Sequence, residues 1–362
     1  MPLQCGIVGL PNVGKSTLFN CLSNAKAQAA NFPFCTIEPN VGVITVPDER
    51  LEVLTGLVKP QKIVPTTIEI VDIAGLVKGA SKGEGLGNQF LGNIRTTDAI
   101  IHVLRCFDDD NVIHVDGSVD PVRDKEIIDM ELQLKDLDSI EKKLAKVSKS
   151  SVMSDKKAAE ILLKIKATLE QGKSVRTLGL DETELEHIED LGLLTAKPVL
   201  YVCNVDEAAV VNGNAHVDRV KQAIATENAE LLIISAAIES EITQLESLDE
   251  QLEFLQSMGL NESGVSKLIK SAYKLLTLQT YFTAGVQEVR AWTITAGTKA
   301  PQAAGVIHTD FEKGFIRAEV MAYNDFATLG SEAACREVGK LRVEGKEYTV
   351  ADGDIMHFRF NV

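Results

Sequence analysis

A glycine-rich stretch near the beginning of the chain has the residue types and spacing needed to hold phosphate groups. The segment Gly9-Leu-Pro-Asn-Val-Gly14-Lys15-Ser16 matches the pattern G-x-x-x-x-G-K-[ST] and lies between an apolar run and a predicted helix. In this pattern backbone N–H groups surround phosphate oxygens, and the helix N-terminus attracts the anion. Lys15 is predicted to contact the β- and γ-phosphates, and Ser16 to offer its hydroxyl to Mg²⁺. The predicted phosphate-binding set is completed by Asn12, Val13, Gly14 and Thr17.

Two further segments supply candidate metal ligands and catalytic groups. Asp72-Ile-Ala-Gly75 follows an apolar run. An aspartate at this position can hold Mg²⁺ through water, and the backbone N–H of Gly75 can contact the γ-phosphate when it is present. Upstream, Thr36 is the candidate second ligand of Mg²⁺. Its segment is expected to close over the site only when a triphosphate is bound. The predicted metal ligands are therefore Ser16, Thr36 and Asp72. The candidate catalytic residues are Lys15, Thr36 and Gly75.

The candidate base-recognition loop departs from the usual guanine-binding sequence Asn-Lys-x-Asp. Here it reads Asn204-Val-Asp-Glu207, so that Glu207 replaces the aspartate and Val205 replaces the lysine that covers the base. A carboxylate displaced by one methylene loses the two-hydrogen-bond geometry that selects guanine. The remaining base-contact loop is predicted at Ser235 and Ala236, after a later apolar run.

The segment after Asp72 also departs from the Ras-like pattern. Leu76 stands where Ras-like enzymes hold a glutamine that orients the attacking water, so hydrolysis is expected to be slow or to be completed by another group. One candidate for this other group is a K⁺ ion. An asparagine at the position of Asn12 in the phosphate loop can help to hold K⁺ near the phosphates. The alternative is that Asn12 only shapes the loop.

Short apolar runs alternate with helical or glycine-rich stretches through the first part of the chain. This alternation predicts an α/β fold with a parallel sheet and helices on both faces, and the motifs fall at the carboxyl ends of the strands. The strands of the first sheet are predicted at Cys5–Gly9, Ile68–Asp72, Ile100–Arg105, Val199–Asn204 and Leu231–Ser235.

Two other regions have a different pattern. Apolar residues from Met130 to Val147 recur at the helical period, and a second helical run covers Lys156–Leu169, which predicts an antiparallel helical hairpin inserted at 128–196. From residue 278 to 362, glycine-punctuated strands predict a small α+β binding module. Its strands are predicted at Val289–Thr295, Phe315–Val320, Glu347–Val350 and Met356–Phe360. We therefore expect a domain at 1–277 that contains the hairpin, followed by a second domain.

Composition limits the compartment and the partners. The six cysteines are scattered without a C-x-x-C pair, which indicates reduced thiols and a cytoplasmic protein. No apolar run approaches the ~20 residues of a membrane helix, so no membrane partner is expected. The net charge of -15 should repel nucleic acid, and no DNA binding is expected.

One segment of this acidic chain is basic. Between residues 142 and 157 there are six lysines and one acidic residue, Asp155, near the turn of the predicted hairpin. These lysines form either a solvated helix surface or a local contact with RNA phosphates. The six are Lys142, Lys143, Lys146, Lys149, Lys156 and Lys157.

The whole chain resembles the YchF / Obg-like ATPase family, a class of P-loop nucleotide triphosphatases. The resemblance is carried by Gly9–Thr17, Asn31–Thr36, Asp72–Val77, Gly79–Gly87 and the pair Asn204 and Glu207, and extends to Ala300–Asp310 and Gly314–Glu319. It implies a Ras-like domain at 1–277 with the hairpin insert, and a β-grasp (ubiquitin-like) TGS domain at 278–362. It also implies a preference for ATP over GTP, Mg²⁺ as cofactor and association with the ribosome. The base is implied to lie beside Asn204, Val205 and Glu207.

The expected function is thus an ATPase that binds and slowly hydrolyses ATP with Mg²⁺ as a switch, as a monomer that docks on the ribosome. Two alternatives stay open at this point. One is a GTPase of the same fold that tolerates Glu207. The other is a nucleotide-dependent adaptor with little turnover, which the leucine at position 76 permits.

Overall fold

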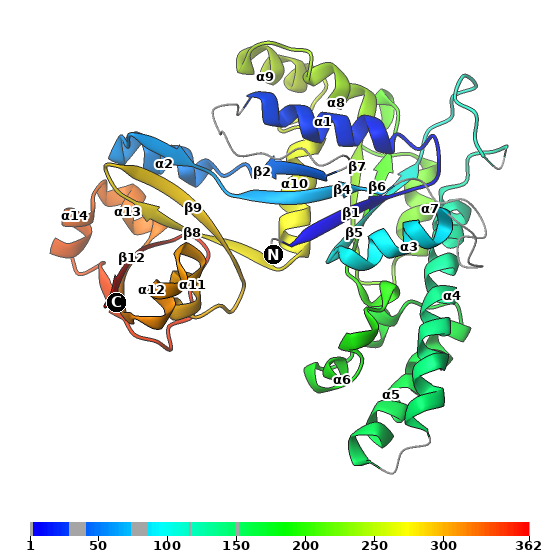
Figure 1. Cartoon of the computed structure of the whole chain (residues 1–362). Coiled ribbons are helices and arrows are strands. Elements are labelled where there is room, and N and C mark those ends of the chain that lie inside the picture. The colour runs from blue at the N-terminus through cyan, green and yellow to red at the C-terminus, as the bar shows by residue number, and fades with distance from the viewer. Residues whose placement is uncertain (1–2, 29–40, 74–85, 116, 149–151, 362) are drawn as a thin grey trace. The chain divides into compact units, whose positions relative to one another are not determined.

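The contacts of the chain divide it into two compact units. The computed structural model describes residues 3–28, 41–73, 86–115, 117–148 and 152–361 (Figure 1). The N-terminal unit comprises Met1–Val43 and Glu69–Leu268, and the C-terminal unit comprises Ile44–Ile68 and Ile269–Val362.

The N-terminal unit is built on a six-stranded sheet with the order β2-β4-β1-β5-β6-β7. The pairs β1–β4, β1–β5, β5–β6 and β6–β7 are all parallel, and every residue of β5 is buried. Because β1 lies between β4 and β5, the loop after β1 leaves the sheet at a point where the strand order reverses, which is where α/β sheets bind ligands. The strands are β1 (Gln4–Val8), β2 (Val41–Thr45), β4 (Thr67–Asp72), β5 (Ala99–Arg105), β6 (Val199–Asn204) and β7 (Glu230–Ile234).

Helices connect these strands and cover the sheet (Figure 1). The α-helices are α1 (Lys15–Gln28), α3 (Leu86–Thr96), α4 (Pro121–Val147), α5 (Met153–Glu170), α6 (Glu182–Glu186), α7 (Ala215–Ala223), α8 (Ala236–Ile242), α9 (Leu248–Ser257) and α10 (Gly264–Leu275). The 3-10 helices are η2 (Val175–Leu178), η3 (Glu189–Leu191), η4 (Leu194–Ala196) and η5 (Glu207–Ala209).

The consecutive helices α4 and α5 pack against each other and extend from the sheet as the α4/α5 pair (Figure 1). Helix α4 begins with Pro121 after Asp120, whose side chain accepts hydrogen bonds from the backbone N–H groups of Val122 and Arg123. The pair has its own hydrophobic core, which occupies the region predicted at 128–196. Its buried members are Ile140, Leu162, Ile165, Leu169, Val175, Ile188 and Leu193.

The C-terminal unit has a mixed sheet with the order β11-β10-β12-β8-β9-β3. The central pair β12–β8 and the edge pair β3–β9 are parallel, whereas β10–β11, β10–β12 and β8–β9 are antiparallel. The strands are β3 (Lys62–Val64), β8 (Leu278–Ala284), β9 (Glu288–Thr295), β10 (Phe315–Ala322), β11 (Arg342–Glu344) and β12 (Asp354–Phe360). The helices are α2 (Glu49–Val58), α11 (Ala300–Ile307), α12 (Thr309–Lys313), α13 (Tyr323–Leu329) and α14 (Glu332–Glu337).

The grouping of residues 44–68 differs from the expected boundary at 277. Strand β3 adds to the edge of the C-terminal sheet, and Leu51 and Leu54 of α2 are buried in the same core cluster as Phe282 and Ile355. Arg50 Nη1 also donates to Asp352 Oδ2 at 2.7 Å. Apolar burial therefore assigns this early segment to the later unit.

Most of the predicted strands are present, with one error. The five strands predicted for the first sheet match β1, β4, β5, β6 and β7, but Glu347–Val350 is not a strand, since Thr349 forms only an isolated bridge to Lys299. Throughout the described segments, no helix combines the length and apolar character needed to cross a bilayer. The described cysteines are free and buried, in agreement with the predicted reduced thiols: Cys5, Cys21, Cys106, Cys203 and Cys335.

A buried carboxylate anchors the α4/α5 pair to the chain that follows it, and this contact gives a stability prediction. Asp136 accepts from Leu194 N at 2.9 Å, Thr195 N at 2.8 Å and Thr195 Oγ1 at 2.6 Å. Asp136→Ala leaves these donors unsatisfied, so the free energy of unfolding in urea should fall by about 3 kcal/mol. Asp138→Ala, which removes an exposed partner of Lys142, should change it by less than ~0.5 kcal/mol. Equal losses for the two variants would contradict the anchoring role.

Candidate functional site

The phosphate loop joins β1 to α1 at the carboxyl edge of the first sheet. Asn12 and Gly14 both have positive φ, at 63° and 90°. A Cβ on Gly14 would lie 2.2 Å from Asn204 Nδ2, and one on Gly9 would lie 2.8 Å from the carbonyl oxygen of Val103. Only glycine fits at either place, so the predicted glycines are required by the close approach of neighbouring strands.

Lys15 and Asp72 meet at this edge, as their positions in the sequence suggested. The Lys15 ammonium, which is largely buried, donates to the Asp72 carboxylate at the end of β4. Ser16 lies beside Lys15 in the first turn of α1 and is exposed. The N-terminus of α1 therefore supplies a cation and a hydroxyl, and β4 supplies a carboxylate in contact with that cation, which is the combination that a phosphate with its metal needs.

The donor chemistry fits Mg²⁺. Hydroxyl and carboxylate oxygens are the ligands that Mg²⁺ prefers, and it commonly takes only one or two from the protein beside phosphate oxygens. Within the described ranges, no group of three or more His, Cys, Asp or Glu side chains forms a metal cluster. A metal at this edge would thus depend on Ser16 and Asp72 together with a nucleotide. Thr36 and Gly75, together with Leu76, lie outside the described residues.

Asn204 connects the phosphate loop to the base-contact loop. Its side-chain Nδ2 donates to the carbonyl oxygen of Val13 at 2.9 Å, and its Oδ1 accepts from the backbone N–H of Ala236 at 2.9 Å. Both ends of the buried amide are therefore used within the protein. Asn204 consequently sets the spacing of two loops that belong to different strands.

The other predicted base-loop residues differ in exposure. Glu207 is exposed at the start of η5, so its carboxylate is accessible to a ligand. Val205 is only 2% exposed, which leaves its side chain unable to cover a base in this structure. Ser235 is fully buried, and its Oγ has no hydrogen-bond partner in the part of the chain that is described.

Sequence reasoning missed the segment after β5. Arg105, the last residue of β5, is buried and donates to the carbonyl oxygens of Phe107, Val112 and Asp109 at 3.1, 2.8 and 3.1 Å. The segment that it shapes reaches the phosphate loop, where Asn12 Nδ2 donates to the Ile113 carbonyl oxygen at 3.0 Å. An arginine at the end of an otherwise apolar strand is the available sequence signal.

A second missed residue is Glu239, one turn into α8. Its carboxylate accepts from the backbone N–H groups of Gly264 at 2.7 Å and Val265 at 3.1 Å, at the positive end of α10. Burial raises the pKa of the Glu239 carboxyl, although these two backbone donors act in the opposite direction. Helix α8 is thus held at Ala236 by Asn204 and at Glu239 by α10.

Comparison with known proteins gives consistent matches over the whole chain. Residues 4–149 match the family MMR_HSR1, described as a 50S ribosome-binding GTPase, and residues 278–361 match YchF-GTPase_C, described as a protein of unknown function. The chain is 55% identical over 365 residues to "Ribosome-binding ATPase YchF" of Haemophilus influenzae, and 55% identical over 367 residues to the protein of the same name in Bacillus subtilis, with 100% of each chain covered.

A solved structure has the same fold. The structure of the Schizosaccharomyces pombe YchF GTPase aligns with a TM-score of 0.90 at 42% sequence identity, covering 99% of this chain and 97% of that chain.

The role of Asn204 can be tested with both purine nucleotides. Asn204→Ala removes the bond to each loop, so binding of labelled ATP and of labelled GTP should weaken together, by about 10- to 100-fold in a fluorescence titration. Asn20→Ala, on the exposed side of α1, is the matched control and should bind both nucleotides like the wild type. A selective loss of one nucleotide would show that Asn204 reads the base instead of spacing the loops.

Proposed function

The chain belongs to the YchF family, and we propose that it binds ATP with Mg²⁺, hydrolyses it slowly as a conformational switch, and associates with the ribosome. The observation that carries the hydrolytic function is the contact of Lys15 with Asp72 at the carboxyl edge of the sheet, with Ser16 next to Lys15 in the first turn of α1. This arrangement belongs to P-loop nucleoside triphosphatases. The proposed association with the ribosome is supported by the bacterial relatives, which are named ribosome-binding ATPases.

In this proposal the predicted site residues have separate tasks. Asn12 to Thr17 bind the phosphates, with Lys15 stabilising the negative charge that develops on them. Ser16 and Thr36 would hold Mg²⁺ directly and Asp72 through water, and the ion would neutralise charge on the phosphates. The backbone N–H of Gly75 would contact the γ-phosphate when it is present.

The choice between ATP and GTP rests on the base loop. The bacterial relatives are named ATPases, whereas the solved Schizosaccharomyces pombe structure is described as a GTPase. Glu207 favours ATP here, because its exposed carboxylate stands one methylene away from where the aspartate of a guanine site would accept two hydrogen bonds. The base would be bordered by Asn204 to Glu207 on one side, and by Ser235 and Ala236 on the other.

The remaining assignments extend the family resemblance. We assign the N-terminal domain to 1–277, apart from residues 44–68 that group with the later unit, with a helical-hairpin insert at 128–196, and the mixed sheet and helices of 278–362 to a TGS domain of β-grasp fold. The parallel pairing of β12 with β8 at the centre of that mixed sheet supports the second assignment. We further propose a cytoplasmic monomer without membrane or DNA partners.

Nucleotide preference can be tested at Glu207. The wild type should bind ATP more tightly than GTP in a competition titration. Glu207→Asp restores the shorter carboxylate, so the ratio of the two affinities should move toward GTP by about 10- to 100-fold, the effect of a hydrogen bond to a charged group. Glu253→Asp, which makes the same change at an exposed position of α9, is the control and should leave the ratio unchanged. A wild type that prefers GTP would show the adenine proposal to be wrong.

A monovalent cation at Asn12 can be tested by exchanging the salt. The hydrogen bond to Ile113 uses only the Asn12 amide nitrogen, so its carbonyl oxygen can still accept a cation. The single-turnover rate of ATP hydrolysis should be at least about tenfold higher in KCl than in NaCl, and Asn12→Ala should remove the difference. Equal rates in both salts would mean that Asn12 only shapes the loop.

Ribosome binding is proposed to use the lysines near the end of the α4/α5 pair. Lys142 Nζ contacts Asp138 Oδ2 at 2.7 Å and Lys143 contacts Asp190, whereas Lys146, Lys156 and Lys157 are exposed. Lys149 lies outside the described residues. Exposed lysines on a projecting helix pair can contact RNA phosphates beyond the ~8 Å over which the acidic body repels them.

Charge reversal tests this contact. The triple variant with Lys146, Lys156 and Lys157 each changed to Glu should sediment with ribosomes at least about tenfold more weakly at low salt, and with a smaller salt dependence, while binding ATP normally. A control with Lys221, Lys313 and Lys346 each changed to Glu has the same net charge and should bind like the wild type. If both triple variants lose the same affinity, net charge and not the α4/α5 pair determines binding.

A further inference from the structure

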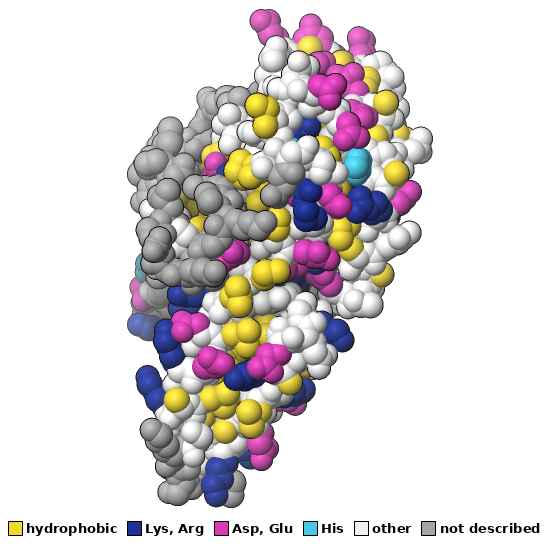
Figure 2. Space-filling view, turned by 90° about the vertical axis from the view of Figure 1, so that its right-hand side faces the viewer, with side chains coloured by type: hydrophobic (Ala, Val, Ile, Leu, Met, Phe, Trp, Pro, Cys, Tyr) yellow, Lys and Arg dark blue, Asp and Glu magenta, His cyan; other side chains and the backbone are white. Residues whose placement is uncertain are grey.

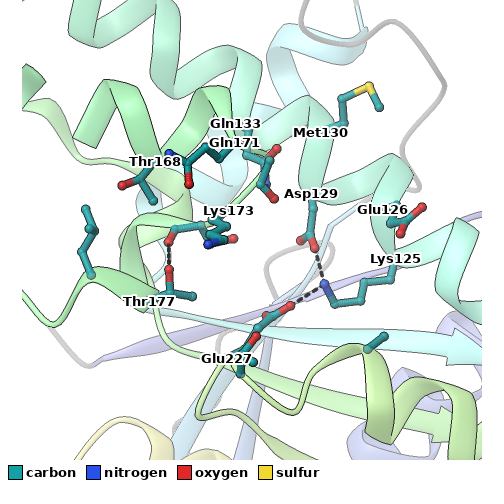
Figure 3. A pocket seen from close by; sticks show the side chains of 15 residues that line it. Lys125, Glu126, Asp129, Met130, Gln133, Thr168, Gln171, Lys173, Thr177 and Glu227 are labelled. Atoms are coloured by element: carbon teal, nitrogen blue, oxygen red, sulfur yellow. Dashed lines mark hydrogen bonds and ion pairs between the residues drawn. The ribbon is translucent and has the colours of Figure 1, made fainter. Parts of the chain in front are cut away.

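A cavity of about 830 Å³ lies at the base of the α4/α5 pair, but its charges are already paired within the protein (Figure 3). Lys125 Nζ lies 2.5 Å from Asp129 Oδ2 and 2.5 Å from Glu227 Oε1, so one cation bridges two carboxylates. Figure 2 shows acidic and basic side chains interleaved with hydrophobic ones along the same helix pair. The cavity and the face beside it therefore favour no charge class of ligand.

A second cavity, of about 380 Å³, lies in the sheet of the C-terminal unit. Four consecutive residues of β12, Met356–Arg359, line it. Successive side chains of a strand point to opposite faces of a sheet. A cavity that touches all four therefore lies at the edge of β12 and not on one of its faces.

The helices around this cavity lead to the same conclusion. Phe311 of α12 and Glu332 of α14 both line it. Phe311 packs on the core cluster that contains Met356, whereas Cys335 of α14 belongs to the cluster that contains Ile355. Because Ile355 and Met356 are neighbours in one strand, these clusters lie on opposite faces of the sheet. The cavity is thus a gap in the sheet that is open toward both faces.

The gap exists because β12 is longer than its neighbour β8. Strand β12 pairs with β10 from Asp354 to Phe360, whereas its parallel pairing with β8 is the single pair Ile355 and Phe282. Strand β8 ends two residues after Phe282, while β12 continues for five residues after Ile355. In an antiparallel pair, every second residue directs its N–H and C=O groups away from the partner strand. Within the described residues, the end of β12 therefore has main-chain groups that face no strand.

One side of the gap is aromatic. Trp292, Phe311 and Phe358 line it, and all three side chains are half-buried. The ring of Phe311 stacks on that of Phe360, with 3.7 Å between the centroids, so the aromatic wall continues to the end of β12. An apolar side chain that entered the gap on this side would be surrounded by rings.

The other side is polar, and its charged groups have partners. Glu332 Oε2 lies 3.3 Å from His357 Nε2, and Glu332 Oε1 accepts from Arg336 Nη2 at 2.8 Å. Arg359 Nη2 donates to Glu319 Oε2 at 3.0 Å. This side can therefore accept a polar side chain without requiring a charge of either sign.

The gap is less suited to a nucleobase than its aromatic wall suggests. The Arg290 guanidinium already lies over the Trp292 ring, with its Cζ 3.9 Å from the centroid. Glu288, which also lines the gap, has a half-buried side chain whose carboxylate would repel a phosphate. Main-chain groups at a strand edge, by contrast, are matched by the main chain of another strand.

We propose that this gap binds an extended segment of a protein partner, which adds to the edge of β12 as a strand. Main-chain groups of the segment would pair with β12 between Met356 and Phe360, the mode of binding called β-augmentation. Alternate side chains of the segment would be apolar toward Trp292 and Phe311 and polar toward His357. The partner is thus recognised by its backbone and by an apolar–polar alternation.

Trp292 gives a readout inside the gap, because it is the single tryptophan of the chain. The first probe is a peptide of about ten residues in which valine and phenylalanine alternate with threonine and glutamine. The second probe is the same peptide with a methyl group on each backbone nitrogen, which removes its donors. The first peptide should protect Trp292 of the full-length protein from acrylamide quenching. It should bind at least about tenfold more tightly than the methylated peptide.

Two variants test the aromatic wall. Phe311→Ser should weaken the first peptide at least about tenfold, because it opens the apolar side of the gap. Val343→Ser is the matched control and should bind like the wild type, since Val343 is 61% exposed but belongs to β11, on the far side of β10. The comparison of the two peptides on the wild type depends on the fold of neither variant.

Several results would overturn the proposal. One is equal binding of the two peptides, and another is no protection of Trp292 by either. Protection by an oligouridine but not by the first peptide would place RNA bases on the aromatic wall instead. Protection that rises with protein concentration in the absence of peptide would mean that a second copy of the chain occupies the gap.

Discussion

The side-chain amide of Asn204 is the interaction on which the candidate active site depends. It holds the carbonyl oxygen of Val13 and the backbone N–H of Ala236 at 2.9 Å each, and so it links the phosphate loop to the base loop. Its Nδ2 also occupies the space in which a Cβ on Gly14 would lie. Position 14 must therefore be glycine for two reasons: the phosphate pattern requires it, and the Asn204 side chain, 190 positions later, leaves no room for a Cβ. The two halves of the nucleotide site cannot be placed independently.

The constraint extends from Asn204 into helix packing. Helix α8 begins at Ala236, the residue that Asn204 holds, and Glu239 one turn later accepts from the first backbone N–H groups of α10. A Cβ on Gly264 would lie 2.8 Å from Ile234 Cγ2 and 2.9 Å from Glu239 Oε1, so α10 can approach only with glycine there. A buried carboxylate at a helix N-terminus is favourable because the helix dipole and two donors compensate its lost hydration. The base loop is thus fixed from two directions without any contact with a ligand.

Sequence reasoning identified the parts of this site that local chemistry determines. The phosphate loop, Lys15 and Asp72 follow from the short-range pattern of a strand, glycines and a helix, and the structure brings Lys15 and Asp72 together. The role of Asn204 as a link, the hydrogen bond from Asn12 to Ile113 and the shaping of that segment by Arg105 all join residues through the fold. The residue types show that these side chains can donate hydrogen bonds. Which backbone carbonyl oxygen accepts each bond depends on the tertiary structure.

The assignment of residues 44–68 failed for the same reason. Leu51 and Leu54 have the spacing of an ordinary amphipathic helix, which says that a face is buried but not against which core. The structure buries them beside Phe282 and Ile355, more than two hundred residues later. Val205 is a related case: it was expected to border the base because of its place in the loop pattern, yet its side chain is buried. In both cases the direction of the side chains depended on packing partners from another part of the chain.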